Sequence, residues 1–156
     1  SVDPAGGSPL LRRLYLDTSL VVAALVHEAG TATALTFLQE HARQPWLISA
    51  WVATELASAL SLQVRRSAIT PQESQEAWQR FLALRGQRLH SLRLAAEDFE
   101  APARFCLAQV PPLRAGDFLH LAVCQRLNLQ LASFDLGLCQ SAAWYQVAHH
   151  ELLIPS

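Results

Sequence analysis

The feature that most constrains the fold of this chain is its alternation of short apolar runs with longer amphipathic segments. The short runs predict strands at residues 11–16, 46–48, 89–92, 129–133 and 144–148. Helical spacing of apolar residues predicts helices at about 20–27, 33–43, 50–66, 71–84, 95–108, 115–127 and 136–142. Short strands separated by helices indicate an α/β fold with a parallel sheet covered on both faces. In such sheets the ligand site lies at the carboxyl ends of the strands.

Length and composition limit the chain to one ordinary domain. Its 156 residues, 51% of them hydrophobic, suit a single core and exclude an intrinsically disordered protein. The most apolar stretch, residues 14–26, is interrupted by Asp17, so we expect no membrane span. We expect a disordered, processed or artificially added N-terminus over residues 1–10, a globular domain over 11–150 and a C-terminal tail over 151–156.

The charge balance argues against a non-specific nucleic-acid binder. All 12 basic residues are arginines, and with 13 acidic residues they give a net charge of −1. Such a chain lacks a strong positive field, so a polyanion would have to be met by a local arginine patch, a metal ion or a partner. The three cysteines form no C-x-x-C pair, and we expect them to be buried, reduced thiols of a cytoplasmic protein.

Four acidic residues lie in unusually apolar surroundings: Asp17, Glu55, Asp117 and Asp135. Burying an ionised carboxylate without a partner costs several kcal/mol, so each is predicted to be a helix cap, an ion-pair member, a protonated acid or a metal ligand. Capping suits the three aspartates, which lie near predicted helix starts, but not Glu55, which lies about one turn inside its helix. The acids at the start of the helix after Leu94, including Asp98, are expected to be solvated or capping.

Considered together, the four acids favour a metal site. Asp17 and Asp135 come at the carboxyl ends of strands, and Asp117 begins a helix beside them. Four carboxylates meeting at one sheet edge would repel one another by several kcal/mol unless a cation neutralised them. Oxygen ligands without clustered Cys or His suit Mg²⁺ or Mn²⁺, and these ions serve phosphoryl chemistry.

Four segments of the sequence resemble the motifs of the PIN domain: Leu14–Ser19, Thr54–Leu56, Leu113–Ala122 and Ser133–Asp135. The third segment, with the sequence LRAGDFLHLA, is the most specific of them. The order and spacing of all four acids also match. The resemblance covers residues 11–147 and is to the VapC-type toxins of bacterial type II toxin–antitoxin systems.

This resemblance implies a three-layer α/β/α sandwich and a metal-dependent endoribonuclease. It implies that Mg²⁺ or Mn²⁺ is held by Asp17, Glu55, Asp117 and Asp135. A bound water would then attack an RNA phosphodiester in line. The implied partners are the RNA substrate, a second copy of the chain in a homodimer, and a small cognate antitoxin that wraps the toxin and inserts a segment into the acidic site.

Several residues near the acids are candidates for supporting roles. By the same resemblance, Thr18 or Ser19 orients an acidic ligand or the water, and either is also a possible cap of the first helix. Arg114 lies near Asp117 in sequence, where an ion pair or a phosphate contact is plausible. His120 shares a helix side with Asp117, and we expect it to be packed or supporting rather than a metal ligand.

Other residues are weaker candidates. Further possible RNA contacts are Arg65, Arg66, Arg85 and Arg88. The pair His149-His150 is too isolated in the sequence to predict a metal site. The tryptophans are expected in the core, although Trp51 lies one turn before Glu55.

Two other functions compete with the nuclease hypothesis. The chain could be a catalytically silent PIN-like module that binds RNA or a protein, which its near-zero net charge would suit. A phosphatase-like hydrolase on a similar scaffold is disfavoured because no Asp-x-Asp motif follows the first strand.

Overall fold

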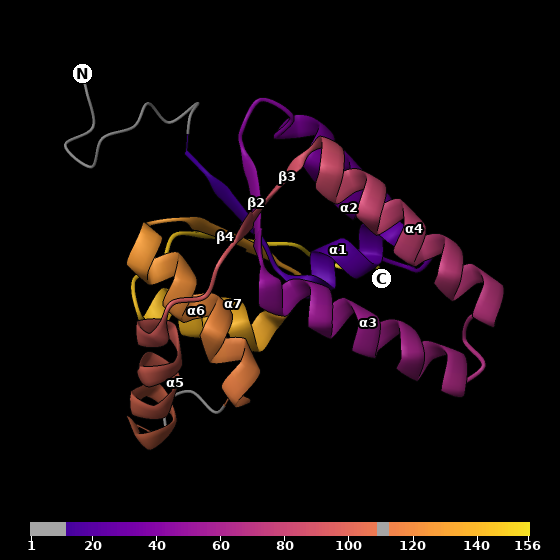
Figure 1. Cartoon of the computed structure of the whole chain (residues 1–156). Helices are drawn as coiled ribbons and strands as arrows, with labels where there is room; N and C mark the ends of the chain where they lie inside the picture. Colours follow the sequence, from indigo (N-terminus) through magenta and orange to yellow (C-terminus); the bar gives the residue numbers. More distant parts are fainter. Residues whose placement is uncertain (1–11, 109–112) are drawn as a thin grey trace.

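A parallel sheet of five short strands forms the centre of the molecule (Figure 1). The computed structural model describes residues 12–108 and 113–156. Its strands are β1 (Leu14–Leu16), β2 (Trp46–Ser49), β3 (Leu89–Leu92), β4 (Gln130–Ser133) and β5 (His149–Glu151). Their order is β3-β2-β1-β4-β5, and every neighbouring pair is parallel. The predicted parallel sheet is therefore confirmed.

Two groups of helices cover this sheet. The first group is α1 (Thr18–Leu25), α2 (Thr31–Glu40), α3 (Ala50–Arg65) and α4 (Pro71–Gln87). The second is α5 (Ala96–Ala108), α6 (Ala115–Leu127) and α7 (Leu136–Trp144). Packing occurs within each group, and the groups lie on opposite sides of the sheet (Figure 1). Right-handed crossovers explain this: the chain moves outward from β1 to β3, then returns past β1 to β4 and β5. The expected three-layer α/β/α sandwich is confirmed.

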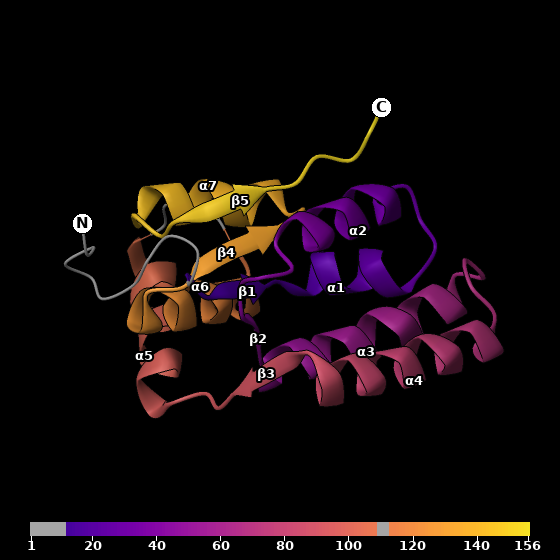
Figure 2. The same ribbon diagram turned by 90° about the horizontal axis from the view of Figure 1, so that it is seen from above.

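Helices α3 and α4 form a hairpin that extends beyond the carboxyl ends of the strands (Figure 2). The start of α4 follows directly from its sequence. The Thr70 hydroxyl accepts the Glu73 N–H at 3.0 Å, and the Glu73 carboxylate accepts the Thr70 N–H at 3.3 Å. Pro71 occupies the first turn, where its missing N–H costs nothing. Arg80 ties α4 to α1 by donating to the carbonyl of Leu25 at 2.6 Å.

Burial on both faces of the sheet explains why the inner strands are continuous apolar runs in the sequence. Every residue of β1 and β2 is buried, as expected for parallel strands covered on both faces. Tyr15 on β1, Phe81 on α4 and Phe118 on α6 are among the largest fully buried side chains. A polar group among them, such as the Tyr15 hydroxyl, must find a partner inside the protein.

The last strand lies later in the chain than predicted. Residues 144–148 were expected to form it, but Trp144 is the final residue of α7 and β5 is His149–Glu151. The chain turns between them at Gln146, whose φ is 58°. The N–H of Val147 then donates back to the carbonyl of Ala142 at 2.8 Å. The apolar character of Trp144 therefore belongs to a helix end, and the sheet continues past residue 150, with Leu152 buried behind it.

Two smaller expectations were also wrong. The N-cap of α1 is Asp17 rather than Thr18 or Ser19, because those hydroxyls bond to carboxylates instead. Asp98 has the capping role that was one of its two expected roles, because its carboxylate accepts the Ala95 N–H at the start of α5, but with 1% exposure it is buried. Cys106 is exposed, whereas the other two free cysteines are buried as expected.

The ends of the chain add little to the fold description. The expected N-terminal segment, residues 1–10, lies outside the described residues. Among the helices of the described part, none has both the length and the hydropathy needed to cross a membrane.

Candidate active site

The acids singled out from the sequence lie around the carboxyl edge of the sheet. Asp17 follows β1, and Asp135 comes two residues after β4, which is the neighbour of β1 in the sheet. The N–H of Asp17 donates to the carbonyl of Ala132 on β4 at 3.1 Å, which ties the two strand ends together. Glu55 approaches from the second turn of α3, and Asp117 from the first turn of α6.

Asp17 is buried, and one of its two carboxylate oxygens is held by hydroxyl groups. Its Oδ2 accepts hydrogen bonds from Ser19 Oγ at 2.6 Å and from Ser133 Oγ at 2.5 Å. Its Oδ1 lies 3.6 Å from Nε2 of His120. Although Asp17 occupies the N-cap position of α1, its side chain makes no capping bond. The capping interpretation therefore does not explain this carboxylate.

Glu55 is held in a similar way, again through one oxygen. Its Oε1 accepts a hydrogen bond from Thr18 Oγ1 at 2.8 Å and a short one from Nε2 of His120. Its side chain is 26% exposed, so it lies between the interior and solvent. Thr18 and Ser19 thus each bond to a different acid at this edge.

His120 is fully buried and links the acids to the interior. Its Nδ1 lies 2.7 Å from the hydroxyl of Tyr15, which in turn lies 2.8 Å from the hydroxyl of Ser49. Burial lowers the pKa of His120. The hydrogen bond to Glu55 and the negative charge of Asp17 raise the pKa, and together the raising effects outweigh burial, so the net shift is upward. His120 is therefore buried and packed behind the acids.

Asp117 shows that the four carboxylates influence one another. Its pKa is raised, first by burial of the carboxyl group and next by the negative charge of Asp135. His120 acts in the opposite direction, while Glu55 and Asp17 raise the pKa further. Among the described residues, the Asp117 carboxylate has no hydrogen-bond or ion-pair partner. It is therefore a half-buried, unpartnered acid surrounded by like charges.

Asp135 is the one acid of the four that caps a helix with its side chain. Its Oδ1 accepts the N–H of Leu138 at 3.0 Å at the start of α7. Its own N–H donates to Ser133 Oγ at 2.9 Å, and the same hydroxyl donates to Asp17. Ser133 thus connects the two acids that follow neighbouring strands.

The donor chemistry at this edge fits a hard divalent cation. All four acids offer carboxylate oxygens, and each keeps at least one oxygen that no hydrogen bond within the described residues occupies. Mutual repulsion of the kind that raises the Asp117 pKa is what a cation would relieve. In the described ranges, however, no three Asp, Glu, His or Cys side chains are already arranged to hold a metal ion. The four carboxylates therefore fit such an ion by their donor chemistry.

Two residues flank the acids on the solvent side. Arg114 is the N-cap residue of α6; it is exposed, and its side chain has no hydrogen-bond or ion-pair partner within the described residues. Trp51 packs its indole against Gly116, where a Cβ atom would lie 3.1 Å from the ring. The glycine therefore permits the close approach of α3 and α6 that brings Glu55 near Asp117.

Sequence reasoning missed three hydroxyl groups of this site: Tyr15, Ser49 and Ser133. Ser133 stands two residues before Asp135 at the end of β4, a position from which it could have been suspected. Tyr15 lies between two leucines in a buried strand, which signals only that its hydroxyl needs a partner. Which partner it takes depends on His120, 105 residues away in sequence.

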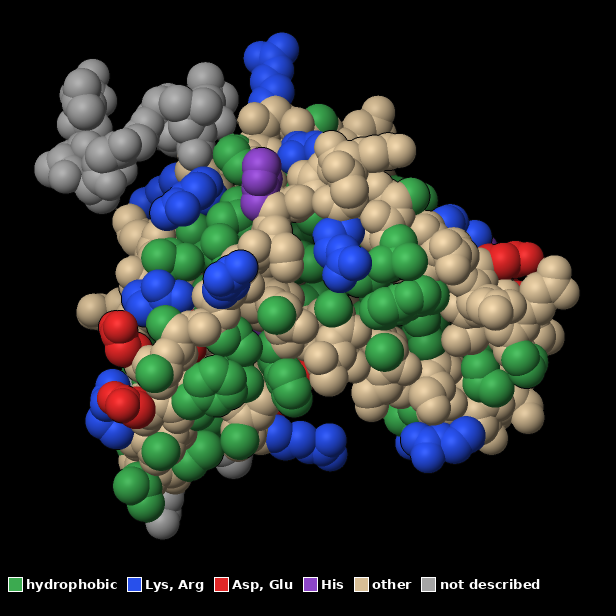
Figure 3. All heavy atoms as spheres, viewed as in Figure 1, with side chains coloured by type: hydrophobic (Ala, Val, Ile, Leu, Met, Phe, Trp, Pro, Cys, Tyr) green, Lys and Arg blue, Asp and Glu red, His purple; other side chains and the backbone are tan. Residues whose placement is uncertain are grey.

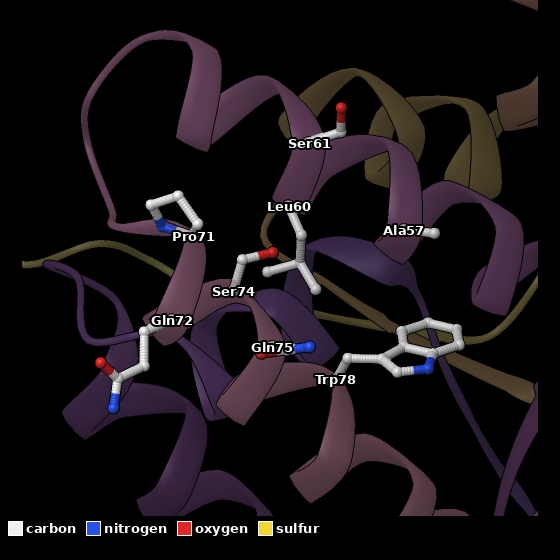
Figure 4. A pocket seen from close by; sticks show the side chains of 8 residues that line it. All are labelled: Ala57, Leu60, Ser61, Pro71, Gln72, Ser74, Gln75 and Trp78. Carbon is white, nitrogen blue, oxygen red and sulfur yellow. The ribbon is translucent and has the colours of Figure 1, made fainter.

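A surface groove lies elsewhere, between α3 and α4 (Figure 4). It measures about 790 Å³ and is lined by Ala57, Leu60, Ser61, Pro71, Gln72, Ser74, Gln75 and Trp78. None of these side chains titrates near neutral pH. The groove therefore offers contact surface rather than acid–base or metal chemistry.

The model of the PIN domain matches residues 14–143, which contain all four acids. The chain belongs to the PIN domain family. No curated protein matches the sequence significantly.

Several solved structures share this fold. VapC20 of Mycobacterium tuberculosis, described as a toxin that cleaves the sarcin–ricin loop, superposes with a TM-score of 0.63 at 19% identity, covering 82% of this chain and 94% of that one. VapBC2 of Rickettsia felis, solved on a promoter DNA fragment, gives 0.63 at 18% identity over 89% and 98%. FitAcB of Neisseria gonorrhoeae gives 0.56 at 17% identity over 88% and 96%. At these identities the likeness establishes the fold.

Proposed function

We propose that this PIN domain is a metal-dependent endoribonuclease and the toxin of a type II toxin–antitoxin module. The observation that carries the proposal is the cluster at the carboxyl edge, where Asp117 is surrounded by the like charges of Asp135, Glu55 and Asp17. A protein of marginal stability retains such repulsion where function requires it. Membership of the PIN family and the fold shared with VapC20 support the same conclusion.

In this proposal Mg²⁺ or Mn²⁺ is held by carboxylate oxygens of Asp17, Glu55, Asp117 and Asp135. When bound, such an ion activates water and stabilises charge on a phosphodiester. The hydroxyls of Ser19 and Ser133 fix one oxygen of Asp17, so that the other points toward the cluster. Thr18 does the same for Glu55.

RNA would approach from the solvent side of the acids. Arg114 is exposed at the start of α6, three residues before Asp117, and is suited to a phosphate contact. The net charge of −1 is also unevenly distributed. Arginine side chains are spread over the face seen in Figure 3, on which acidic side chains are few. This face supplies the local basic surface that a near-neutral chain needs to meet a polyanion.

The proposed partners follow from the toxin assignment. The structurally similar VapC20 is described as a toxin, and we propose that this chain likewise acts as a toxin, binds a small antitoxin, forms a homodimer and acts in the cytoplasm. Expression in bacteria tests the assignment. Growth arrest that is relieved by the small open reading frame adjacent to its gene is expected, and normal growth in its absence would contradict it.

The nuclease activity is tested with a matched pair of amide variants. Glu55→Gln is expected to lower Mn²⁺-dependent RNA cleavage at least 100-fold, whereas Glu100→Gln, which changes an exposed acid on α5, keeps the wild-type rate. Asp17→Asn and Asp117→Asn should behave like Glu55→Gln. Wild-type protein that binds no Mn²⁺ and cleaves no RNA would instead identify a catalytically silent binding module.

A further inference from the structure

A chain of buried hydrogen bonds runs from the interior of the sheet to the acids. It passes from Ser49 at the end of β2 to Tyr15 on β1, then to His120 on α6 and Glu55 on α3. Ser49, Tyr15 and His120 are each no more than 1% exposed. RNA cannot reach them, so they act on the site through the acids that His120 meets: Glu55 by a hydrogen bond, and Asp17 at 3.6 Å.

The chemistry of the four groups sets the direction of this chain. An ionised carboxylate only accepts hydrogen bonds, so Nε2 of His120 donates to Glu55. When the His120 ring is neutral, its other nitrogen carries no hydrogen, so Nδ1 accepts from the Tyr15 hydroxyl at 2.7 Å. The Tyr15 oxygen then accepts from Ser49 at 2.8 Å. Each buried polar group in the chain is satisfied.

We propose that His120 is a positioning residue that holds the Glu55 carboxylate at the acid cluster, and that Tyr15 determines which nitrogen of the His120 ring carries the hydrogen. His120 and Thr18 both bond to Oε1 of Glu55, which leaves Oε2 without a hydrogen bond in the described part of the chain. The carboxylate is thereby oriented with one oxygen reserved for a cation. This step rests on the proposed function in so far as Glu55 is a metal ligand.

Two amide variants of His120 separate positioning from any acid–base role, since neither amide titrates. A glutamine amide reaches about as far from the backbone as Nε2, and an asparagine amide about as far as Nδ1. His120→Gln therefore keeps a donor for Glu55, whereas His120→Asn keeps only a partner for Tyr15. In Mn²⁺ titration calorimetry, we expect His120→Gln to bind within about threefold of wild type and His120→Asn about 10-fold more weakly. Equal losses in both variants, or no loss in His120→Asn, would overturn the proposal.

A second measurement needs no metal and no activity. At a pH above the raised pKa of His120, where the ring is neutral, its ¹⁵N chemical shifts report the tautomer, and we expect the Nε2–H form in wild type. Tyr15→Phe removes one oxygen atom and should replace this signature with a mixture of tautomers. Tyr145→Phe removes the same atom from the C-cap of α7 and should leave it unchanged. An identical ¹⁵N pattern in wild type and Tyr15→Phe would refute the role given to Tyr15.

The proposed metal site and the positioning role of His120 can be refuted separately. If Glu55→Gln binds Mn²⁺ as wild type does, Glu55 is not a ligand and the proposed metal site is wrong, whatever the ring shifts show. If Glu55→Gln loses binding but His120→Asn does not, the metal site stands and the positioning role falls. Near-ultraviolet circular dichroism of each variant checks that it is folded. If Tyr15→Phe does not fold, the two His120 variants carry the test.

Discussion

The ion pair between Asp98 and Arg126 gives the sharpest prediction for stability, because its two members differ in their access to water. The Asp98 carboxylate is 1% exposed and accepts from Arg126 Nε at 2.7 Å and from a terminal nitrogen at 2.9 Å. The Arg126 side chain is 29% exposed. The pair joins α5 to α6, the helix that carries Asp117 and His120.

Arg126→Ala should cost more than Asp98→Ala. Removing Arg126 leaves a buried carboxylate with only the Ala95 N–H as partner, for which we expect a loss of about 3 kcal/mol. Asp98→Ala deletes the ion pair and a helix cap worth about 1 kcal/mol. Because the freed Arg126 side chain can turn to water, we expect a total loss of stability of about 2 kcal/mol. The double variant should cost about 2 kcal/mol, as Asp98→Ala alone does, because no charge is then left buried.

Urea unfolding followed by far-ultraviolet circular dichroism measures these differences, and the melting temperature of Arg126→Ala should fall by roughly 6–12 °C. Arg104→Ala, which removes an exposed arginine of α5, is the control and should change stability by less than about 0.5 kcal/mol. Costs that simply add in the double variant would show that the two side chains are not coupled, and a loss under about 1 kcal/mol for Arg126→Ala would refute the argument from burial.

Three further predictions concern the acid edge. Asp117→Asn should raise the free energy of unfolding at pH 7 by roughly 0.5–2 kcal/mol while abolishing cleavage. Because the folded-state pKa of Asp117 is raised, this gain in stability should appear as pH rises through that pKa and vanish in acid. Urea unfolding at neutral and at acidic pH checks the sign. Gly116→Ala should cost about 1 kcal/mol, since crowding of Trp51 outweighs the gain in helix propensity, and a more stable variant would contradict this. Ser133→Ala removes the hydroxyl that lies 2.5 Å from Asp17 and should weaken Mn²⁺ binding by about 10-fold in calorimetry, with unchanged affinity as the opposing result.

Local sequence was sufficient for most of the fold because each element is encoded within itself. The capping box at Thr70 and Glu73 marks the start of α4 by bonds between residues three apart. Apolar spacing along α3 matches the buried positions Val52, Leu56 and Leu60. The last strand was misplaced because Trp144, Tyr145 and Val147 are apolar, and nothing local shows that α7 extends to Trp144 before the chain turns at Gln146.

The sequence of residues 14–143 is sufficient to identify a PIN domain. It also shows which acids follow the strands, because strand ends and helix starts are set by neighbours in sequence. The tertiary structure alone decided how those acids are held. His120 meets Glu55 from 65 residues away and Tyr15 from 105, and Asp98 meets Arg126 across 28. Such contacts depend on how whole helices pack against the sheet, and no periodicity along the chain records that packing.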